Sequence, residues 1–264
     1  ISRLFGIKFI IHWHFGRIQE LSEIKNAEWK ILKKVIKSAH TSIVLDQNSL
    51  KCLIKNGLKN VVLIPNPISE NLNEIAKTFI FENKKIDDGV FVFVGHILPA
   101  KGVFELVEAC SRIEEIKQLI MIGPYNEDVK NKLVKIASQR NNGAWLKWKG
   151  EIQREEVFQY LHTANALCLP SYSEGFPYVV LEAMALGCPV VTTRVGAIEE
   201  MILSDDFGKA GICIEPRNVD QLTNALNLLI NNSEEARDFG SNGNLRVLSK
   251  YTLEKVFHQY ENIW

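Results

Sequence analysis

Two glutamates in the segment SYSEGFPYVVLEAMALGCPVVTT (171–193) have the residue type and spacing to bind a sugar. Glu174 precedes a predicted helix, since Pro177 is typical of a first helical turn and Gly187 of a helix end. Glu182 then lies about 7–9 Å further along the helix axis, at ~1.5 Å per residue. Each carboxylate can accept hydrogen bonds from two neighbouring hydroxyls of a sugar. The alternative interpretation is a loop charge followed by a carboxylate on the solvent-exposed face of the helix.

The turn between these glutamates predicts an anion-binding element. Backbone amides at a helix N-terminus carry partial positive charge and lack partners within the helix. Here they belong to the turn formed by Gly175, Phe176 and Pro177. A carboxylate before the amides and another beyond them would bracket a diphosphate. That order of groups suits a nucleotide sugar, which consists of a sugar, a diphosphate and a ribose.

A second anion site is predicted in VGHILPAKGVFELVEAC (94–110), whose pattern indicates a strand, a loop and a helix. Lys101 lies in the loop that leads into the helix, so its ammonium adds to the helix dipole. Gly95 and His96 follow the strand directly. The segment has neither the G-x-G-x-x-G dinucleotide pattern nor a Walker loop. An exposed loop lysine that serves only solubility is the alternative interpretation.

Short apolar runs alternate with segments of helical periodicity along nearly the whole chain. This alternation predicts βαβ units and an α/β fold with parallel sheets covered on both faces. Strands are expected at 8–14, 41–46, 60–65, 89–95, 117–123, 144–150, 166–171, 188–193 and 211–216, with helices near 26–38, 48–57, 101–115, 126–140, 153–162, 177–186 and 218–231. Ligands of open parallel sheets bind beyond the carboxyl ends of the strands. The loops after Val94 and Pro170 and the turn TRVGAIEEMI (193–202) are therefore expected at one edge.

A change in composition divides the chain into two Rossmann-like units. Pro65 and Pro67 stop a strand, polar residues follow, and a new strand opens at Val90. We expect four parts: residues 1–68 as a first α/β domain, 69–88 as a linker, 89–248 as a second α/β domain, and 249–264 as an amphipathic helix. About 68 residues hold only ~3 strands, so the first domain is expected to be incomplete.

Composition and charge exclude several classes of protein. The chain has 264 residues, 46% hydrophobic and 23% charged, which is typical of a soluble globular protein. No apolar run approaches the ~20 residues needed to cross a bilayer. The five cysteines are widely spaced and form no CxxC pair, which argues against a disulfide framework or a zinc site. Residues 1–60 contain 11 Lys and Arg against 4 Asp and Glu, a net +7, so this part suits an anionic surface or phosphate, with solvated lysines as the alternative.

These motifs together resemble the group 1 family of retaining glycosyltransferases (family 4). The matching features are the loop VGHILPAKG, the turn WKGEI, the segment LPSYSEGFPYVVLEAMALGCPVV and the turn VGAIEEMI. The resemblance implies a GT-B arrangement of two Rossmann-like domains, and its motifs cover roughly residues 60–231. It further implies that residues 1–68 are the C-terminal part of an N-terminal, acceptor-side domain, that 89–248 form the donor-binding domain, and that the helix at 249–264 crosses back toward the first domain.

The resemblance also implies roles for individual residues. Glu174 would contact the hydroxyls of the transferred sugar and Glu182 the ribose. Lys101 would bind the donor diphosphate and stabilise the departing nucleoside diphosphate. Family members usually carry an arginine five residues before this lysine, where this chain has His96, which is only partly charged near neutral pH.

The segment KFIIHWHFG (8–16) supplies a further candidate from the first domain. His12 and His14 lie two residues apart on a predicted strand and so point to one face. The family often places a histidine after such a strand, beside the donor sugar, which implies that role for His14 and a packing role for His12. A structural role for both is the alternative.

The expected function is transfer of a sugar from a nucleoside-diphosphate sugar to a glycan or lipid-linked acceptor in polysaccharide biosynthesis. We expect neither a metal nor another cofactor, because no carboxylate cluster of the DxD type stands at a strand end. The expected location is the cytoplasm or the inner face of the membrane, with peripheral membrane contact as an option and without a nucleic-acid partner.

Rival functions stay open at this point. The family's first domain begins with a strand and a glycine-containing loop that this sequence does not show. A non-catalytic nucleotide-sugar-binding subunit or an inactive, truncated glycosyltransferase is therefore the main alternative. A GT-B epimerase or phosphorylase is the alternative among enzymes.

Overall fold

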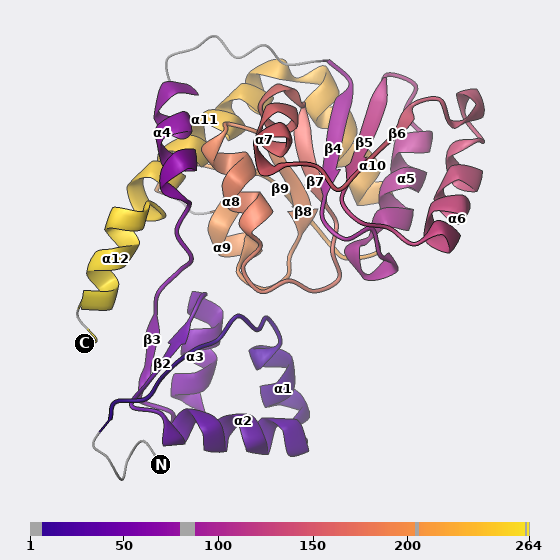
Figure 1. The fold of residues 1–264 in the computed structure, drawn as a ribbon. Helices are drawn as coiled ribbons and strands as arrows, with labels where there is room; N and C mark the ends of the chain where they lie inside the picture. The colour runs from indigo at the N-terminus through magenta and orange to yellow at the C-terminus, as the bar shows by residue number, and fades with distance from the viewer. Residues whose placement is uncertain (1–6, 80–87, 204–205, 262, 264) are drawn as a thin grey trace.

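The computed structural model describes residues 7–79, 88–203, 206–261 and 263, which form two α/β units (Figure 1). Within these ranges every strand is parallel to its neighbours and lies inside one of the predicted apolar runs: β1 (Ile10–His12), β2 (Thr41–Val44), β3 (Val61–Leu63), β4 (Val90–Val94), β5 (Gln118–Ile122), β6 (Leu146–Gly150), β7 (Ala166–Leu169), β8 (Val190–Thr193) and β9 (Gly211–Ile214). The α/β fold class is thereby confirmed.

The smaller unit has a three-stranded sheet in the order β1-β2-β3. Neighbouring residues of a strand point to opposite faces. Val44 lies in the core beneath α1 (Ile18–Ile24), α2 (Ala27–Ser38) and α3 (Gln47–Lys55), whereas Ile43 faces the other way. There it clusters with Ile64 and with Val256 of α12 (Leu253–Glu261). The last described helix of the chain therefore covers one face of the first sheet.

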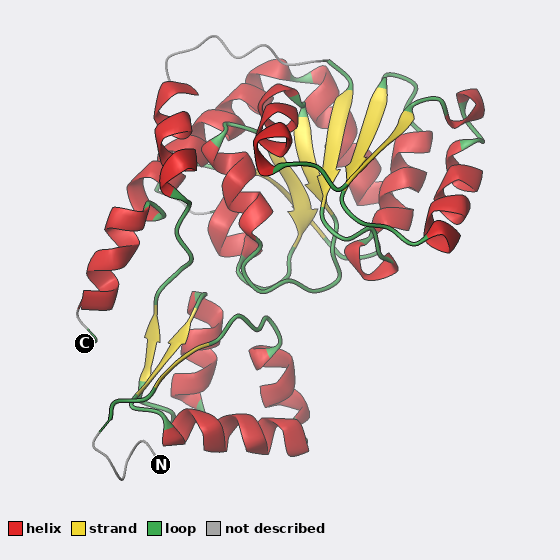
Figure 2. Ribbon diagram, in the orientation of Figure 1, coloured by secondary structure: helices red, strands yellow, loops and turns green. Residues whose placement is uncertain are grey.

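The larger unit has a six-stranded sheet in the order β6-β5-β4-β7-β8-β9, with helices on both faces (Figure 2). On one face, helix α5 (Val103–Ser111) contacts both α6 (Glu127–Ala137) and α10 (Val219–Asn231). Helices α7 (Arg154–Thr163), α8 (Tyr178–Ala185) and α9 (Ile198–Ile202) belong to the other βα connections. Central strands such as VFVFV and ALCL are buried because both faces of the sheet are covered.

Among the described residues, the helices that the sequence did not predict include α1, α4 (Glu70–Phe79) and α11 (Ser233–Lys250). The segment expected as a linker contains α4, and its residues Leu72 and Ala76 belong to the core of the larger unit through contacts with α8 and α11. The rest of that segment, residues 80–87, lies outside the described residues. The sequence pattern did not predict α4 because the helix is mostly polar, ENLNEIAKTF, with only a narrow apolar stripe.

Candidate functional site

The order in which strands are added to the larger sheet reverses between β4 and β7. The loops after these two strands carry the predicted site residues. Strands β5 and β6 extend from β4 on one side, and β8 and β9 extend from β7 on the other. Ligands bind at such a switch point because the connections on its two sides run to opposite faces and leave a crevice. Lys101 follows β4 and Glu174 follows β7. These loops lie at the edge of the larger sheet that faces the smaller unit (Figure 1).

Lys101 and Glu174 form an ion pair at this switch point. Nζ of Lys101 donates to Oε1 of Glu174 over 2.7 Å, and the Ser171 hydroxyl donates to the same oxygen over 2.6 Å. The side chains are 29% exposed for Lys101 and 11% for Glu174. A charged hydrogen bond is stronger here than at the open surface because water screens it less. An ammonium has three N–H donors, so Lys101 can also contact an anion while it stays paired.

The backbone of the Glu174 loop lies against two glycines. A Cβ atom at Gly16 of the smaller unit would lie 2.0 Å from the carbonyl oxygen of Glu174. A Cβ atom at Gly196, after β8, would lie 2.1 Å from the same oxygen. Ala197 N donates to the carbonyl of Gly175 over 2.9 Å. Glycine at both positions therefore allows loops from three parts of the chain to meet at Glu174.

Helix α8 begins at Tyr178, with Pro177 as the residue before it. Proline has no backbone N–H, so Pro177 supplies no donor to an anion, contrary to the expectation for this turn. Tyr178 and Val179, in the first turn of α8, have amides that the helix itself leaves without a partner. Phe176 is buried and contacts the ring of Tyr251 edge-on, with 5.9 Å between ring centroids. Its side chain therefore belongs to the contact between α8 and the C-terminal helices.

Glu182 is buried on α8 and has a partner that the sequence did not reveal. Nε and Nη2 of Arg154, the first residue of α7, donate to Oε1 of Glu182 over 2.9 and 2.6 Å. Burial raises the pKa of Glu182, and the charge and hydrogen bonds of Arg154 partly offset that shift. Glu182 thus does not lie on a solvent-exposed helix face. No local pattern links residues 28 positions apart, so only the contact between α7 and α8 identifies Arg154.

Gly95 and His96 lie where the sequence placed them, directly after β4. Gly95 adopts φ 144° and donates its N–H to the carbonyl of Ile122 over 2.9 Å. The side chain of His96 is exposed in the same loop as Lys101. Because this side chain is already exposed, it can contact an anion bound at this edge of the sheet.

The two histidines of β1 have different surroundings. His12 is half-buried, and its Nδ1 lies 3.4 Å from the hydroxyl of Tyr260 on α12. Burial, aided by the nearby charge of His14, lowers the pKa of His12 to about 4, so its ring is neutral at physiological pH. His14 is exposed, with its ring centroid 4.3 Å from that of His12. The carbonyl oxygen of His14 would lie 3.4 Å from a Cβ at Gly175, so the first unit reaches the site at this residue.

The arrangement can bind an anion next to a hydroxylated group. Lys101, exposed His96 and the first amides of α8 are donors, whereas Glu174 and Glu182 are acceptors. In the part of the chain that the structure describes, no group of three or more His, Cys, Asp or Glu side chains could hold a metal ion. Across the same residues, no helix has the length and apolarity needed to cross a membrane.

Solved structures share this fold. Sucrose-phosphate synthase from Thermosynechococcus elongatus superposes with a TM-score of 0.79 at 21% identity, over 99% of this chain and 69% of that one. HepE from Anabaena, in a complex with UDP, also has a TM-score of 0.79, at 18% identity over 99% of this chain and 73% of that one. These likenesses and the two parallel sheets establish a GT-B fold of two Rossmann-like units.

Sequence relatives are glycosyltransferases. An uncharacterised glycosyltransferase of Methanocaldococcus jannaschii is 31% identical over 246 residues, which is 90% of this chain and 66% of that protein. The putative teichuronic acid biosynthesis glycosyltransferase TuaC of Bacillus subtilis is 28% identical over 237 residues, 86% of this chain and 56% of that protein. The chain thus spans less than two thirds of either relative. The model of the glycosyl transferases group 1 family matches residues 74–246, and the chain belongs to that family.

Proposed function

We propose that this chain is the donor-binding part of a retaining glycosyltransferase. It transfers a sugar from a nucleoside diphosphate to a glycan or a lipid-linked acceptor during polysaccharide biosynthesis. The observation that carries the proposal is the Lys101–Glu174 pair at the switch point of the larger sheet, with buried Glu182 about one turn into α8. Two relatives support a role in polysaccharide biosynthesis. TuaC is a putative glycosyltransferase of teichuronic acid biosynthesis, and CapM of Staphylococcus aureus is a glycosyltransferase of capsular polysaccharide biosynthesis.

Each site residue has a role in this proposal. Lys101 and the first amides of α8 bind the donor diphosphate, and the ammonium stabilises charge that develops on the leaving group. Glu174 accepts hydrogen bonds from the hydroxyls of the donor sugar, and Glu182 from those of the ribose. His14 lies beside the sugar, at the point where the smaller unit meets Gly175. The reaction needs no metal in this scheme, so transfer is expected to persist in EDTA.

Calorimetry with UDP, GDP, ADP and CDP tests the donor site. One nucleotide is expected to bind in the micromolar range. Lys101→Ala and Glu182→Ala should each weaken it about ten- to hundredfold, or about 1.5–3 kcal/mol, because each removes a charged partner. Lys132→Ala, on the exposed side of α6, is the matched control. If both site variants bind as tightly as the control, the site is wrongly assigned.

A nucleotide-sugar-binding protein without transfer is the second candidate. It shares the donor site and differs only in turnover. Release of nucleoside diphosphate from the donor sugar, measured with and without a cell-extract acceptor, separates the two. Acceptor-dependent release that Lys101→Ala abolishes supports the enzyme. Tight nucleotide binding without any release supports the binding protein.

We further propose that the chain acts in the cytoplasm and contacts the inner face of the membrane through α2. Lys30, Lys34 and Lys37 are exposed on this helix, and Ile31 is 64% exposed beside them. Lysines near an anionic bilayer contribute about 1 kcal/mol each, and the contact weakens with salt. Sedimentation with vesicles of anionic lipid should therefore retain the protein at low salt only. A triple Lys→Glu variant at these positions should stay in the supernatant.

A further inference from the structure

Tyr172, two residues before Glu174, joins the loop of Glu174 to the loop of Lys101. Its backbone N–H donates to the carbonyl of Ala100 over 2.9 Å. Its hydroxyl donates to Oε1 of Glu105, in the first turn of α5, over 2.6 Å. Tyr172 is therefore bonded to the chain both before and after Lys101.

The backbones of the same two loops also touch. A Cβ atom at Gly102, whose φ is 67°, would lie 2.0 Å from the carbonyl oxygen of Pro170. Glycine is the residue that allows so close an approach at a positive φ. Lys101 precedes this glycine and pairs with Glu174, so the packing of the two loops sets where the ammonium lies relative to the carboxylate.

Glu105 depends on Tyr172 for a hydrogen bond. Oε2 of Glu105 is buried and has no hydrogen-bond partner among the residues that the structure describes. A carboxylate left without donors at such a position is costly, so without the tyrosine hydroxyl Glu105 is expected to turn toward solvent. Burial and the bond to Glu105 raise the pKa of Tyr172, so its hydroxyl keeps the proton that it donates.

A third loop contacts the ring of Tyr172. The guanidinium carbon of Arg217, between β9 and α10, lies 4.5 Å from the centroid of that ring. Arg217 adopts φ 63°, which is uncommon for a residue other than glycine and persists only where the surrounding contacts favour it. The ring of Tyr172 is thus positioned both by its hydroxyl and by a cation–π contact.

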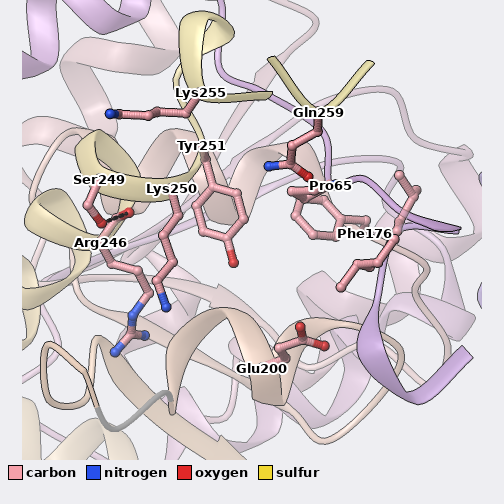
Figure 3. Close-up of a pocket in the computed structure, with 11 residues that line it drawn as sticks. Pro65, Phe176, Glu200, Arg246, Ser249, Lys250, Tyr251, Lys255 and Gln259 are labelled. Atoms are coloured by element: carbon pink, nitrogen blue, oxygen red, sulfur yellow. Dashed lines mark hydrogen bonds between the residues drawn. The ribbon is translucent and has the colours of Figure 1, made fainter. Parts of the chain in front are cut away.

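The other end of the Glu174 loop is fixed by Phe176. Its ring stands edge-on to Tyr251, beside a cavity between the two units (Figure 3). That contact links the loop to the C-terminal helices, whereas Tyr172 links it to the loop of Lys101. The distance between the two charged groups of the proposed donor site therefore depends most directly on Tyr172.

We propose that Tyr172 and Glu105 are positioning residues, which hold Lys101 and Glu174 at the separation that sugar transfer requires. The inference rests on the donor site and the reaction proposed above. In that scheme neither residue contacts the donor, and both act through the backbone of the two loops. Their loss should therefore slow the chemical step, which depends on accurate placement, more than it weakens binding of the nucleotide.

Tyr172→Phe tests the hydroxyl, because phenylalanine keeps the ring that Arg217 contacts. The substrates are the glucose, galactose, mannose and N-acetylglucosamine conjugates of the nucleotide that binds. We expect kcat for release of nucleoside diphosphate to fall about 10- to 100-fold, with KM and the calorimetric affinity for the nucleoside diphosphate within about threefold of the parent. Tyr160→Phe on α7, whose ring has a cation–π contact with Lys149, is the matched control and should equal the parent. Circular dichroism checks that each variant is folded.

Variants of Glu105 test the bond from its other end. Glu105→Gln keeps an acceptor for the tyrosine hydroxyl, so its kcat should stay within about threefold of the parent. Glu105→Ala should lose as much as Tyr172→Phe. The double variant with Tyr172→Phe and Glu105→Ala should lose little more than either single variant, because both changes break the same bond.

The possible results separate this inference from the proposed function. A parental kcat in Tyr172→Phe overturns the inference and leaves the donor-site assignment unaffected. Additive losses in the double variant also overturn it, since the two residues would then act separately. A loss of about tenfold or more in nucleotide affinity would show that Tyr172 holds the binding site itself, and contradicts the inference as well. A parent that releases nucleoside diphosphate from none of these donors overturns the proposed transfer, and this inference with it.

Discussion

At the scale of single residues, Lys101 would have to contact two anionic groups in the proposed scheme. It is bonded to Glu174 in this structure, yet a donor diphosphate would need the same ammonium. Both contacts are compatible because the nitrogen has three donors. In the proposed scheme the carboxylate would lower the net positive charge that a phosphate meets, so Glu174 would weaken binding of a nucleoside diphosphate and favour a donor that also brings sugar hydroxyls.

Glu174→Gln tests this division of roles. Transfer should fall about 10- to 100-fold, because the interaction with the sugar strengthens as charge develops in the transition state. Affinity for the nucleoside diphosphate alone should stay equal or increase, because Lys101 loses its anionic partner. Steady-state kinetics and calorimetry measure the two quantities, with Glu127→Gln in an exposed pair on α6 as the control. A tenfold loss of nucleotide affinity would contradict the assignment.

Arg154→Ala should destabilise the protein in a pH-dependent manner. Burial already raises the pKa of Glu182 in the folded state, and removing Arg154 raises it further. A carboxyl with a raised folded pKa favours folding below its unfolded pKa and loses that contribution as pH rises through the folded pKa. The variant should therefore lose about 1–3 kcal/mol of unfolding free energy at pH 8 and less at pH 4.5.

Urea unfolding of Arg154→Ala at both pH values measures the difference. Arg112→Ala serves as the control, since its ion pairs with Glu108 and Asp220 are exposed. Equal losses at both pH values would show that Arg154 acts by packing on Phe158, with which its guanidinium makes a cation–π contact, rather than through Glu182.

At the scale of elements, the strands could be predicted from the sequence and α11 could not. Runs such as VFVFV identify buried strands because a covered parallel sheet needs apolar residues on both faces. Helix α11 contains Gly240 and Gly243, which lower helix propensity, so its existence depends on tertiary contacts. The same limit applies to the site: Glu174, Glu182 and Lys101 stand in local motifs, whereas Arg154 is recognisable only once α7 lies beside α8.

In the Gly240→Ala variant, the sign of the change in unfolding free energy distinguishes helix propensity from overpacking. Helix propensity alone predicts stabilisation by about 1 kcal/mol. A Cβ atom at this position, however, would lie 2.3 Å from the carbonyl oxygen of Gly187, in the turn that ends α8. We expect overpacking to win and the variant to lose about 1–3 kcal/mol in urea unfolding. Ser241→Ala, exposed on the same helix, should be neutral, and stabilisation by Gly240→Ala would show that α11 can shift away.

At the scale of the whole molecule, the two units meet at the site itself. Gly16 approaches the carbonyl of Glu174, Glu200 accepts from the N–H of Gln47, and α12 covers the sheet of the smaller unit. The contact between Gly16 and Glu174 joins two stretches of backbone, so no side chain there can rotate away to relieve crowding. The distance between the two units at the loop of Glu174 is therefore limited by the size of residue 16.

Gly16→Ala should separate binding from transfer. Its Cβ would lie 2.0 Å from the Glu174 oxygen, so the units must move apart, while the donor site in the larger unit keeps its own contacts. We expect nucleotide affinity within about twofold of the parent and transfer reduced about 10²-fold, since a misplacement near 1 Å costs that much. Small-angle scattering should show a larger radius of gyration, and Gln19→Ala, exposed on α1, should leave all three quantities unchanged. If Gly16→Ala transfers sugar at the parent rate, the approach of His14 and Gly16 to the donor loop is not part of the reaction, and the smaller unit serves only to hold the acceptor.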